Sequence, residues 1–440
     1  MNLALITVVA VAILLFGAVS RRLQTTVLTP PMVFVVLGFV VASERVGFVG
    51  VDLQDEVIGL LAELTLALVL FTDAARIAIR PLRRGFHLPL RLLGVGFPLT
   101  IVAGTLAAQW FFPHFSLWEA ALVGILLAPT DAALGQVVVS SPVVPVRIRQ
   151  ALNVESGLND GLAVPALLIV LPLAGASLGA GTPDGMDLVL RQILLAPAIG
   201  IGIAYLGGGL VDRAVRAGWM DHTFEELSAV ALALLTFSVA QMFEASGFIA
   251  AFCGGLTLGN VHRTVGARLY DFAEAEGQLL ALVTFMTIGG MLVAPILARF
   301  DMTALAYAVL SLTLVRLVPV AVSLAGSGVT PRTTLFLGWF GPRGLASIVF
   351  AVIGVEQQAV PHAEEIFAIT VGTVILSVFA HGLTALPGAH WYARHAAGLT
   401  GAAMRPELQT VAELPVRIPH RGARQGHESS RSVTNKEAAT

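Results

Sequence analysis

The chain has 440 residues, of which 56% are hydrophobic and 12% charged, and its formal net charge is -2. Soluble domains carry about a quarter charged residues, so this composition predicts an integral membrane protein. The basic residues lie in short clusters between apolar runs and not along one face, which argues against nucleic-acid binding.

Two residue types occur only once, and each excludes a class of mechanism. Cys253 is the only cysteine, which excludes an intramolecular disulfide and a multi-cysteine metal site. Lys436 is the only lysine, so there is no Walker A phosphate loop and no intramembrane lysine to carry a proton. The sequence therefore predicts no cofactor.

Apolar segments long enough to cross a membrane can be placed about thirteen times if shorter or broken ones of fewer than about 20 residues are allowed. In chain order they are 3–19, 30–43, 56–75, 86–112, 117–140, 150–174, 188–211, 223–243, 246–260, 273–299, 302–325, 333–356 and 364–388. The first is followed by Arg21 and Arg22 and has no basic residue before it, which indicates a transmembrane helix and not a cleaved signal peptide. We expect an all-α polytopic membrane protein.

Arginine is concentrated in every second connection between these spans, an alternation that is nearly clean, with Arg299 among the other connections. The connections of the arginine-bearing set are 21–22, 76–91, 147–149, 213–216, 262–268, 332 and the segment from 394 onward. Because arginine-rich loops stay on the cytoplasmic side, the alternation predicts an N-terminus outside and a C-terminus in the cytoplasm. Residues 393–440 are rich in Arg, Glu, Ser, Pro and Gly, and we expect a disordered cytoplasmic tail there.

Polar residues interrupt the fifth and sixth spans. The fifth span contains Pro129, Thr130 and Asp131, and the proline predicts a helix break beside the carboxylate. Asp131 lies about 14 residues into its span, roughly 21 Å from the membrane surface at 1.5 Å per residue. Irregular backbone at that depth must be buried in protein or line a cavity, so its oxygens are candidate ligands for an alkali cation.

The sixth span carries Glu155, Ser156, Asn159 and Asp160. The first and third are i, i+4 neighbours, as are the second and fourth, so one helix face holds two carboxylates, an amide and a hydroxyl. Asp160 lies about 10 residues, or roughly 15 Å, from the cytoplasmic side. Ionised carboxylates at mid-membrane depth need a partner, water or a cation. Ion binding or transport is therefore the leading hypothesis for the function.

The second half of the chain supplies two arginines and a second predicted break. Arg316 and Arg343 fall at a depth similar to the carboxylates, and Arg343 lies in the sequence Gly341-Pro342-Arg343-Gly344. The broken spans are the fifth and the twelfth, which run in opposite directions. We expect two inverted six-helix repeats whose broken helices cross near the midplane.

These motifs, in this order, resemble the sodium/proton exchanger superfamily. The resemblance covers roughly residues 1–390 and is closest to the bacterial type of the monovalent cation:proton antiporter 1 branch, which carries an Asn-Asp pair like Asn159-Asp160. It implies a homodimer in the bacterial inner membrane. Within residues 1–392 it implies a mobile core built from helices 4–6 and 11–13, with the other helices as dimerisation scaffold.

The resemblance also implies a role for each polar residue. Asp160 is the principal cation and proton site, and the ligand set is completed by Asp131, Thr130 and Ser156. Glu155 is the structural partner of an arginine, with Arg316 favoured over Arg343. Asn159 stands where electrogenic relatives carry a second aspartate, which implies electroneutral exchange of one Na⁺ for one proton, with Li⁺ also accepted.

Three alternatives stay open at this point. Potassium/proton exchange is the nearest, because both ions prefer the same oxygen ligands. A channel would conduct without a counter-transported proton, and the buried Asp160 argues against it. An intramembrane enzyme is disfavoured because no His-Glu-x-x-His pair occurs and only His381 could accompany a nucleophilic serine.

Overall fold

The computed structural model describes residues 3–23, 26–42, 56–77, 79, 87–131, 134–176, 191–262, 278–279, 281–292, 299–356, 360–399, 405–409 and 411. Throughout these ranges the regular structure is helical. Six helical stretches are long and apolar enough to cross a membrane: His87–Phe111, Val146–Gly175, Ala196–Arg216, His222–Met242, Met302–Leu324 and Ala363–Ala397. The prediction of an all-helical membrane protein is confirmed; the count of thirteen spans and the inverted repeat stay predictions.

The helices of the first half begin with α1 (Leu3–Leu23), α2 (Pro30–Ala42) and α3 (Glu56–Ala75). The next stretch is continuous, from α5 (His87–Arg91) through the π-turn η1 (Leu92–Gly96) to α6 (Phe97–Phe111). Then come α7 (Leu117–Leu126), the short α8 (Gln136–Val139) and the long α9 (Val146–Ala176). The fifth predicted span is thus two helices, α7 and α8, separated by non-helical backbone around Pro129, as its proline predicts.

The second half starts with the π-turn η2 (Arg191–Leu195) and continues with α11 (Ala196–Arg216), α12 (His222–Met242), α13 (Gly247–Val261) and η3 (Ile288–Leu292). It ends with α16 (Met302–Leu312), α17 (Leu314–Leu324), α18 (Pro331–Trp339), α19 (Leu345–Glu356), α20 (Ala363–Ala397) and the 3-10 turn η4 (Pro406–Leu408). The twelfth predicted span is broken between α18 and α19. The eleventh predicted span divides at Thr313, whose hydroxyl donates to Val309 O at 2.6 Å.

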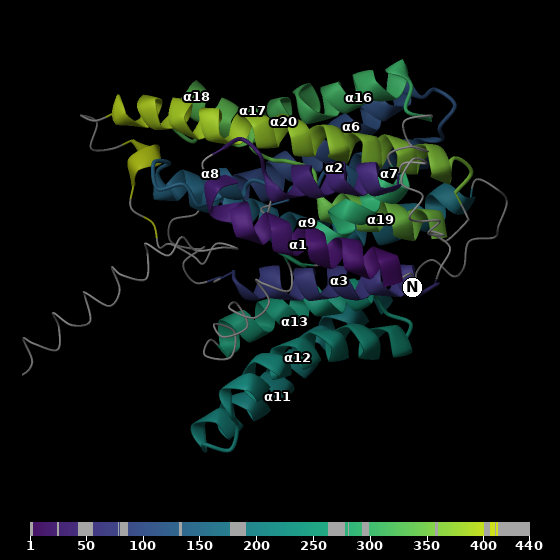
Figure 1. Ribbon diagram of the computed structural model, residues 1–440, viewed down its shortest axis with the longest axis vertical. Coiled ribbons are helices and arrows are strands. Elements are labelled where there is room, and N and C mark those ends of the chain that lie inside the picture. Colours follow the sequence, from purple (N-terminus) through teal and green to yellow (C-terminus); the bar gives the residue numbers. More distant parts are fainter. Residues whose placement is uncertain are drawn as a thin grey trace, which may run out of the picture.

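The helices lie side by side in a bundle (Figure 1). Helices α11, α12 and α13 form one side, and α6, α16, α17, α18 and α20 form the opposite side. Helices α7, α9 and α19 lie between them, and α3 packs against α13. Glycines permit that packing, since Gly255 and Gly259 of α13 lie directly on the backbone of Phe71 and Ala75 of α3.

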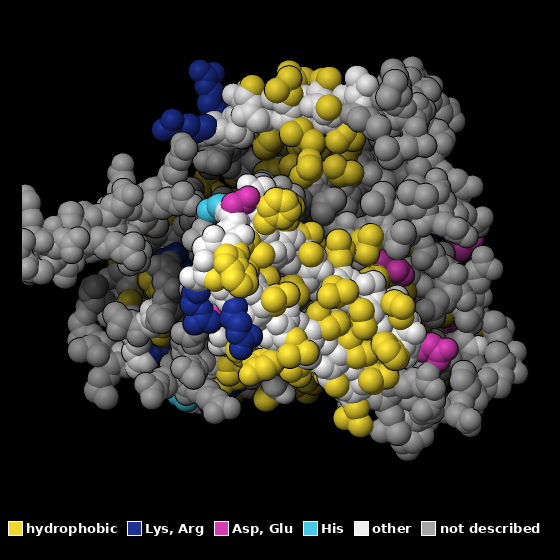
Figure 2. Space-filling model, turned by 90° about the horizontal axis from the view of Figure 1, so that it is seen from below, with side chains coloured by type: hydrophobic (Ala, Val, Ile, Leu, Met, Phe, Trp, Pro, Cys, Tyr) yellow, Lys and Arg dark blue, Asp and Glu magenta, His cyan; other side chains and the backbone are white. Residues whose placement is uncertain are grey.

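The side of the bundle formed by α11 and α12 presents apolar side chains outward (Figure 2). Large exposed hydrophobic residues recur along both helices: Ile201, Tyr205, Leu206, Leu210, Phe224, Leu227, Leu234, Leu235 and Met242. Soluble proteins seldom expose so continuous an apolar surface, whereas lipid tails cover it without cost. Arg213 and Arg216 lie in the last turn of α11, and basic residues at the end of a span are typical of a membrane interface.

The start of the predicted tail is ordered and packed, which differs from the expected disorder. Residues 393–397 belong to α20, and Glu407 in η4 is fully buried. The Glu407 carboxylate accepts hydrogen bonds from Thr330 N at 2.7 Å and from Thr333 Oγ1 at 3.1 Å. This acidic side chain thus satisfies the N–H of the N-cap residue Thr330 at the N-terminus of α18, where a negative charge is favourable. The rest of the predicted tail, from residue 412, lies outside the described residues.

Candidate functional site

The centre of α9 carries a buried polar face. Glu155 and Asn159 lie one turn apart and are 1% and 0% exposed. Ser156 and Asp160 form the neighbouring row and are 6% and 8% exposed. The helix therefore holds its polar face inside the protein, as the i, i+4 spacing predicts.

Thr130, in the non-helical backbone after α7, lies directly on this face. Its hydroxyl is 2.9 Å from Ser156 Oγ and accepts a hydrogen bond from Asn159 Nδ2 at 2.6 Å. The oxygen of the Asn159 amide has no hydrogen-bond partner among the described residues. Two hydroxyls and the Asn159 amide thus meet on the face of α9 that also carries Asp160. Hard cations prefer oxygen ligands such as these hydroxyls and a carboxylate.

The backbone breaks of α7/α8 and α18/α19 contact each other. Asp131 N donates to Pro342 O at 2.8 Å, and Leu345 N donates to Asp131 Oδ2 at 3.1 Å. The first bond joins the two irregular segments, and the second places the Asp131 carboxylate at the N-terminus of α19. One oxygen of Asp131 is therefore engaged in holding the second break, a contact that the sequence does not reveal.

Both glycines around Pro342 make room for a charged side chain. A β-carbon at Gly341 would lie 2.8 Å from Arg316 Nε, and one at Gly344 would overlap the Asp131 carboxylate. The spacing Gly-Pro-Arg-Gly is thus explained by two close approaches, one on each side of the proline.

The two buried arginines have different partners. Arg316 Nη1 lies 2.6 Å from Glu155 Oε1, and both residues are almost fully buried. Arg343 Nη1 donates to two carbonyls of the first break, to Ala128 O at 2.6 Å and to Pro129 O at 3.2 Å. Arg316 thus neutralises a carboxylate of α9, whereas Arg343 holds the backbone immediately before Thr130.

Two further polar residues reach the second break and were not among the predicted site residues. Ser377 and His381 lie one turn apart in α20 and are 0% and 1% exposed. A serine and a histidine at i, i+4 within the last predicted span form a signal that could have identified them. From the sequence, His381 was expected only as a possible partner for a catalytic serine.

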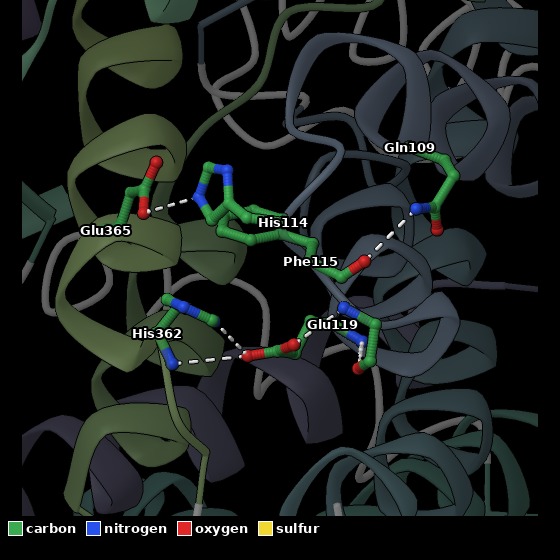
Figure 3. A network of polar contacts seen from close by, with 7 residues as sticks. Gln109, His114, Phe115, Glu119, His362 and Glu365 are labelled. Carbon is green, nitrogen blue, oxygen red and sulfur yellow. Dashed lines mark hydrogen bonds and ion pairs between the residues drawn. The ribbon is translucent and has the colours of Figure 1, made fainter.

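A separate polar network lies where α7 and α20 begin (Figure 3). His362 Nδ1 is 2.7 Å from Glu119 Oε1, and His114 Nε2 is 3.0 Å from Glu365 Oε2. Ser116 forms a capping box with Glu119 at the start of α7. This network fixes the loop before α7 to the start of α20 and contains none of the candidate ion ligands. In the described ranges no group of three or more His, Cys, Asp or Glu residues could hold a metal ion.

Comparison of the sequence with protein-family models defines the class of protein to which the chain belongs. Residues 8–389 match the family model described as sodium/hydrogen exchanger, transmembrane. The chain belongs to the sodium/hydrogen exchanger family, which confirms the resemblance seen in the sequence. Membership places it among the monovalent cation/proton antiporters and not among enzymes.

Individual curated relatives have low sequence identity to this chain. The chain is 25% identical over 392 residues to the K⁺/H⁺ antiporter NhaP of Alkalimonas amylolytica, covering 88% of this chain and 67% of that protein. It is 26% identical over 364 residues to the Na⁺/H⁺ antiporter ApNhaP of Aphanothece halophytica, covering 78% and 67%. The chain spans about two thirds of the length of these curated relatives.

The solved structures support the fold. The sodium proton antiporter MjNhaP1 from Methanocaldococcus jannaschii at pH 8 superimposes with a TM-score of 0.72 at 19% sequence identity. The superposition covers 90% of this chain and 99% of that one. The fold is therefore that of MjNhaP1.

Proposed function

We propose that this chain exchanges a monovalent cation for a proton at the junction of α9 with the two helix breaks. The ligands are Asp160, Asp131, Thr130, Ser156 and Asn159. The observation that carries this proposal is the meeting of the Thr130 and Ser156 hydroxyls with the Asn159 amide beside Asp160, inside the bundle. Burial raises the free energy of an ionised aspartate, and either a proton or a cation relieves it.

The charges around the site support a one-for-one exchange. The neighbouring ionisable groups are three carboxylates, those of Asp131, Glu155 and Asp160, and two guanidinium groups, those of Arg316 and Arg343. If all are ionised, the site carries an excess of one negative charge. One proton or one monovalent cation neutralises that excess, and competition for Asp160 couples the two fluxes without ATP. If the site is neutral both with a proton and with a cation bound, the change between its outward-open and inward-open states moves no net charge across the membrane.

For the transported ion, K⁺ becomes the first candidate and Na⁺ the second. The resemblance seen in the sequence favoured Na⁺. The curated relatives matched over 85% or more of this chain, from Alkalimonas amylolytica and several Shewanella strains, are named K⁺/H⁺ antiporters. The Aphanothece halophytica relative, named a Na⁺/H⁺ antiporter, keeps Na⁺ open. Oxygen ligands bind both K⁺ and Na⁺, so selectivity between the two ions depends on the size of the space that the ligands enclose.

The proposed setting is the one expected from the sequence. It comprises thirteen spans in two inverted repeats, a core of residues 86–174 and 302–388, and a homodimer in the bacterial inner membrane. The N-terminus lies outside and the C-terminus in the cytoplasm. The contact between Asp131 N and Pro342 O supports the crossing of the two breaks.

The experiment is exchange by the full chain in proteoliposomes. A pH-sensitive dye inside acidic vesicles reports proton efflux after addition of KCl, NaCl or LiCl. Asp160→Asn should abolish the signal for every salt. The control is Asp212→Asn, because Asp212 lies on α11 in an ion pair with Arg216, away from the site. Retained exchange in Asp160→Asn would overturn the site, and exchange that responds to an imposed membrane potential would overturn the electroneutral stoichiometry.

A further inference from the structure

Ser377 and His381 form a buried polar pair on α20 that the proposed exchange does not use. Neither side chain is among the proposed ion ligands, and α20 contributes no carboxylate to the site. Yet both face the break between α18 and α19. A buried serine and histidine need hydrogen-bond partners, and their partners identify their role.

Ser377 supplies an acceptor to backbone that has none of its own. Arg343 precedes α19, which begins at Leu345, so its N–H has no carbonyl one turn earlier in a helix. Arg343 N donates to Ser377 Oγ at 2.7 Å. The serine therefore satisfies, from a neighbouring helix, a buried backbone N–H in the irregular segment just before α19.

His381 fixes the orientation of that serine. Its Nδ1 lies 3.0 Å from Ser377 Oγ and 2.9 Å from Ser377 O. Its ring packs on Trp339, the last residue of α18, with ring centroids 5.1 Å apart. Trp339 in turn donates from Nε1 to Thr384 Oγ1 at 2.9 Å. Helix α20 thus contacts both ends of the break between α18 and α19, at Trp339 and at Arg343.

Arg343 links helix α20 to the backbone break between α7 and α8. Its backbone is held by Ser377, while its guanidinium donates to Ala128 O and Pro129 O. Those carbonyls immediately precede Thr130. A rotation of the Arg343 backbone would therefore move the segment that places the Thr130 hydroxyl against Ser156 and Asn159.

We propose that Ser377 and His381 are positioning residues of the cation site, acting through the Arg343 backbone on the segment that carries Thr130. This inference rests on the proposed exchange function. It predicts that loss of the pair weakens cation binding more than it slows turnover, because the ligands remain but their spacing is lost. A pair that only stabilises the bundle would lower the amount of active protein and leave the apparent affinity unchanged.

The test measures exchange by the full chain in proteoliposomes over a range of KCl and, separately, NaCl concentrations. Ser377→Ala removes the acceptor for Arg343 N, and His381→Leu removes the ring nitrogen at similar volume. We expect each to raise the apparent KM for the cation about tenfold with a smaller change in maximal rate, as for a lost buried hydrogen bond. His381→Asn keeps a polar atom near the position of Nδ1 and should restore most of the affinity.

The matched control is Thr373→Val, one turn before Ser377 on α20. Thr373 is also fully buried, but its hydroxyl donates only to Ile369 O in its own helix, at 2.7 Å. It should leave the apparent KM unchanged. Because Ser377 and His381 act in series, the double variant Ser377→Ala/His381→Leu should raise the KM no more than the larger single effect.

Three results overturn the positioning role. They are an unchanged KM in Ser377→Ala and His381→Leu, equal effects of His381→Asn and His381→Leu, or a rise in KM for Thr373→Val as large as for Ser377→Ala. If Ser377→Ala does not fold, the two His381 variants decide the question alone. Failure of the exchange function itself is distinct, because the unmodified chain would then show no cation-dependent proton movement, and a thermal-unfolding double-mutant cycle would still report whether Ser377 and His381 couple.

Discussion

Gly344 leaves the space that the carboxylate of Asp131 occupies at the N-terminus of α19. This relationship joins two motifs more than 200 residues apart in the chain and makes the geometry of one break depend on the other. A glycine there is required by the approach of the carboxylate and not by a left-handed backbone, because the positive-φ glycines of the described residues lie elsewhere.

Gly344→Ala should therefore damage both the site and the fold. The added methyl group overlaps Asp131, which must leave Leu345 N and shift the segment holding Thr130. We expect exchange to fall at least about tenfold and the free energy of unfolding to drop by about 1–3 kcal/mol, the usual range for overpacking a core. The measurements are proteoliposome exchange and thermal unfolding in detergent. Gly202→Ala is the control, because no atom lies within 4 Å of a β-carbon at that position in α11. If Gly344→Ala behaves like Gly202→Ala, the dependence between the breaks is absent.

The ion pair between Glu155 and Arg316 gives a second prediction, on stability. Each residue is 2% exposed or less, so removing one partner leaves the other as an isolated buried charge. Glu155→Gln and Arg316→Met should each lower the free energy of unfolding by about 3–5 kcal/mol. The double variant should recover part of that loss, since no unpaired charge remains. Thermal unfolding of the four proteins forms the cycle, and additive losses in the double variant would contradict a direct pair.

The helix breaks and the polar helix face of the site could be predicted from the sequence, whereas the contacts that surround the site could not. Pro129 and Pro342 were enough to predict two helix breaks, because a proline inside an apolar span removes a helical hydrogen bond wherever it lies. The i, i+4 rows of α9 followed in the same way from helix periodicity. Local rules of this kind need no knowledge of tertiary structure.

Contacts between distant segments were not predictable in this way. Nothing in the local sequence indicates that Ser377 accepts from Arg343 N, or that Gly341 makes room for Arg316, because each contact depends on how helices pack. The same holds for Glu407, whose burial comes from docking on the start of α18 and overrides a composition typical of a solvated tail.

The network of Figure 3 offers a comparison of two carboxylates that each pair with a histidine. Glu119 is 2% exposed and Glu365 is 38% exposed, although both lie within 3.0 Å of an imidazole nitrogen. Glu119→Ala should lower the free energy of unfolding by about 1–3 kcal/mol, because the part-buried donors Ser116 N and His362 N lose a buried acceptor. Glu365→Ala should change it by at most about 1 kcal/mol, as for an exposed pair screened by solvent. Thermal unfolding at one pH and salt concentration checks both; equal losses would show that burial does not separate the two pairs.

The docked segment 405–409 gives the last prediction. Glu407 accepts from Thr330 N and Thr333 Oγ1, and Gln409 accepts from Arg147 at the start of α9, so the segment ties α9 to α18. Truncation after Leu399 should lower the free energy of unfolding by about 1–3 kcal/mol, since Thr330 N and Thr333 Oγ1 at the start of α18 lose a fully buried acceptor. Glu407→Ala in the full chain should reproduce most of that loss. Truncation after Val411 keeps the segment and serves as the control, with stability unchanged. If the two truncations lose stability equally, residues beyond 411 and not the Glu407 contact are responsible, because only the shorter chain lacks Glu407.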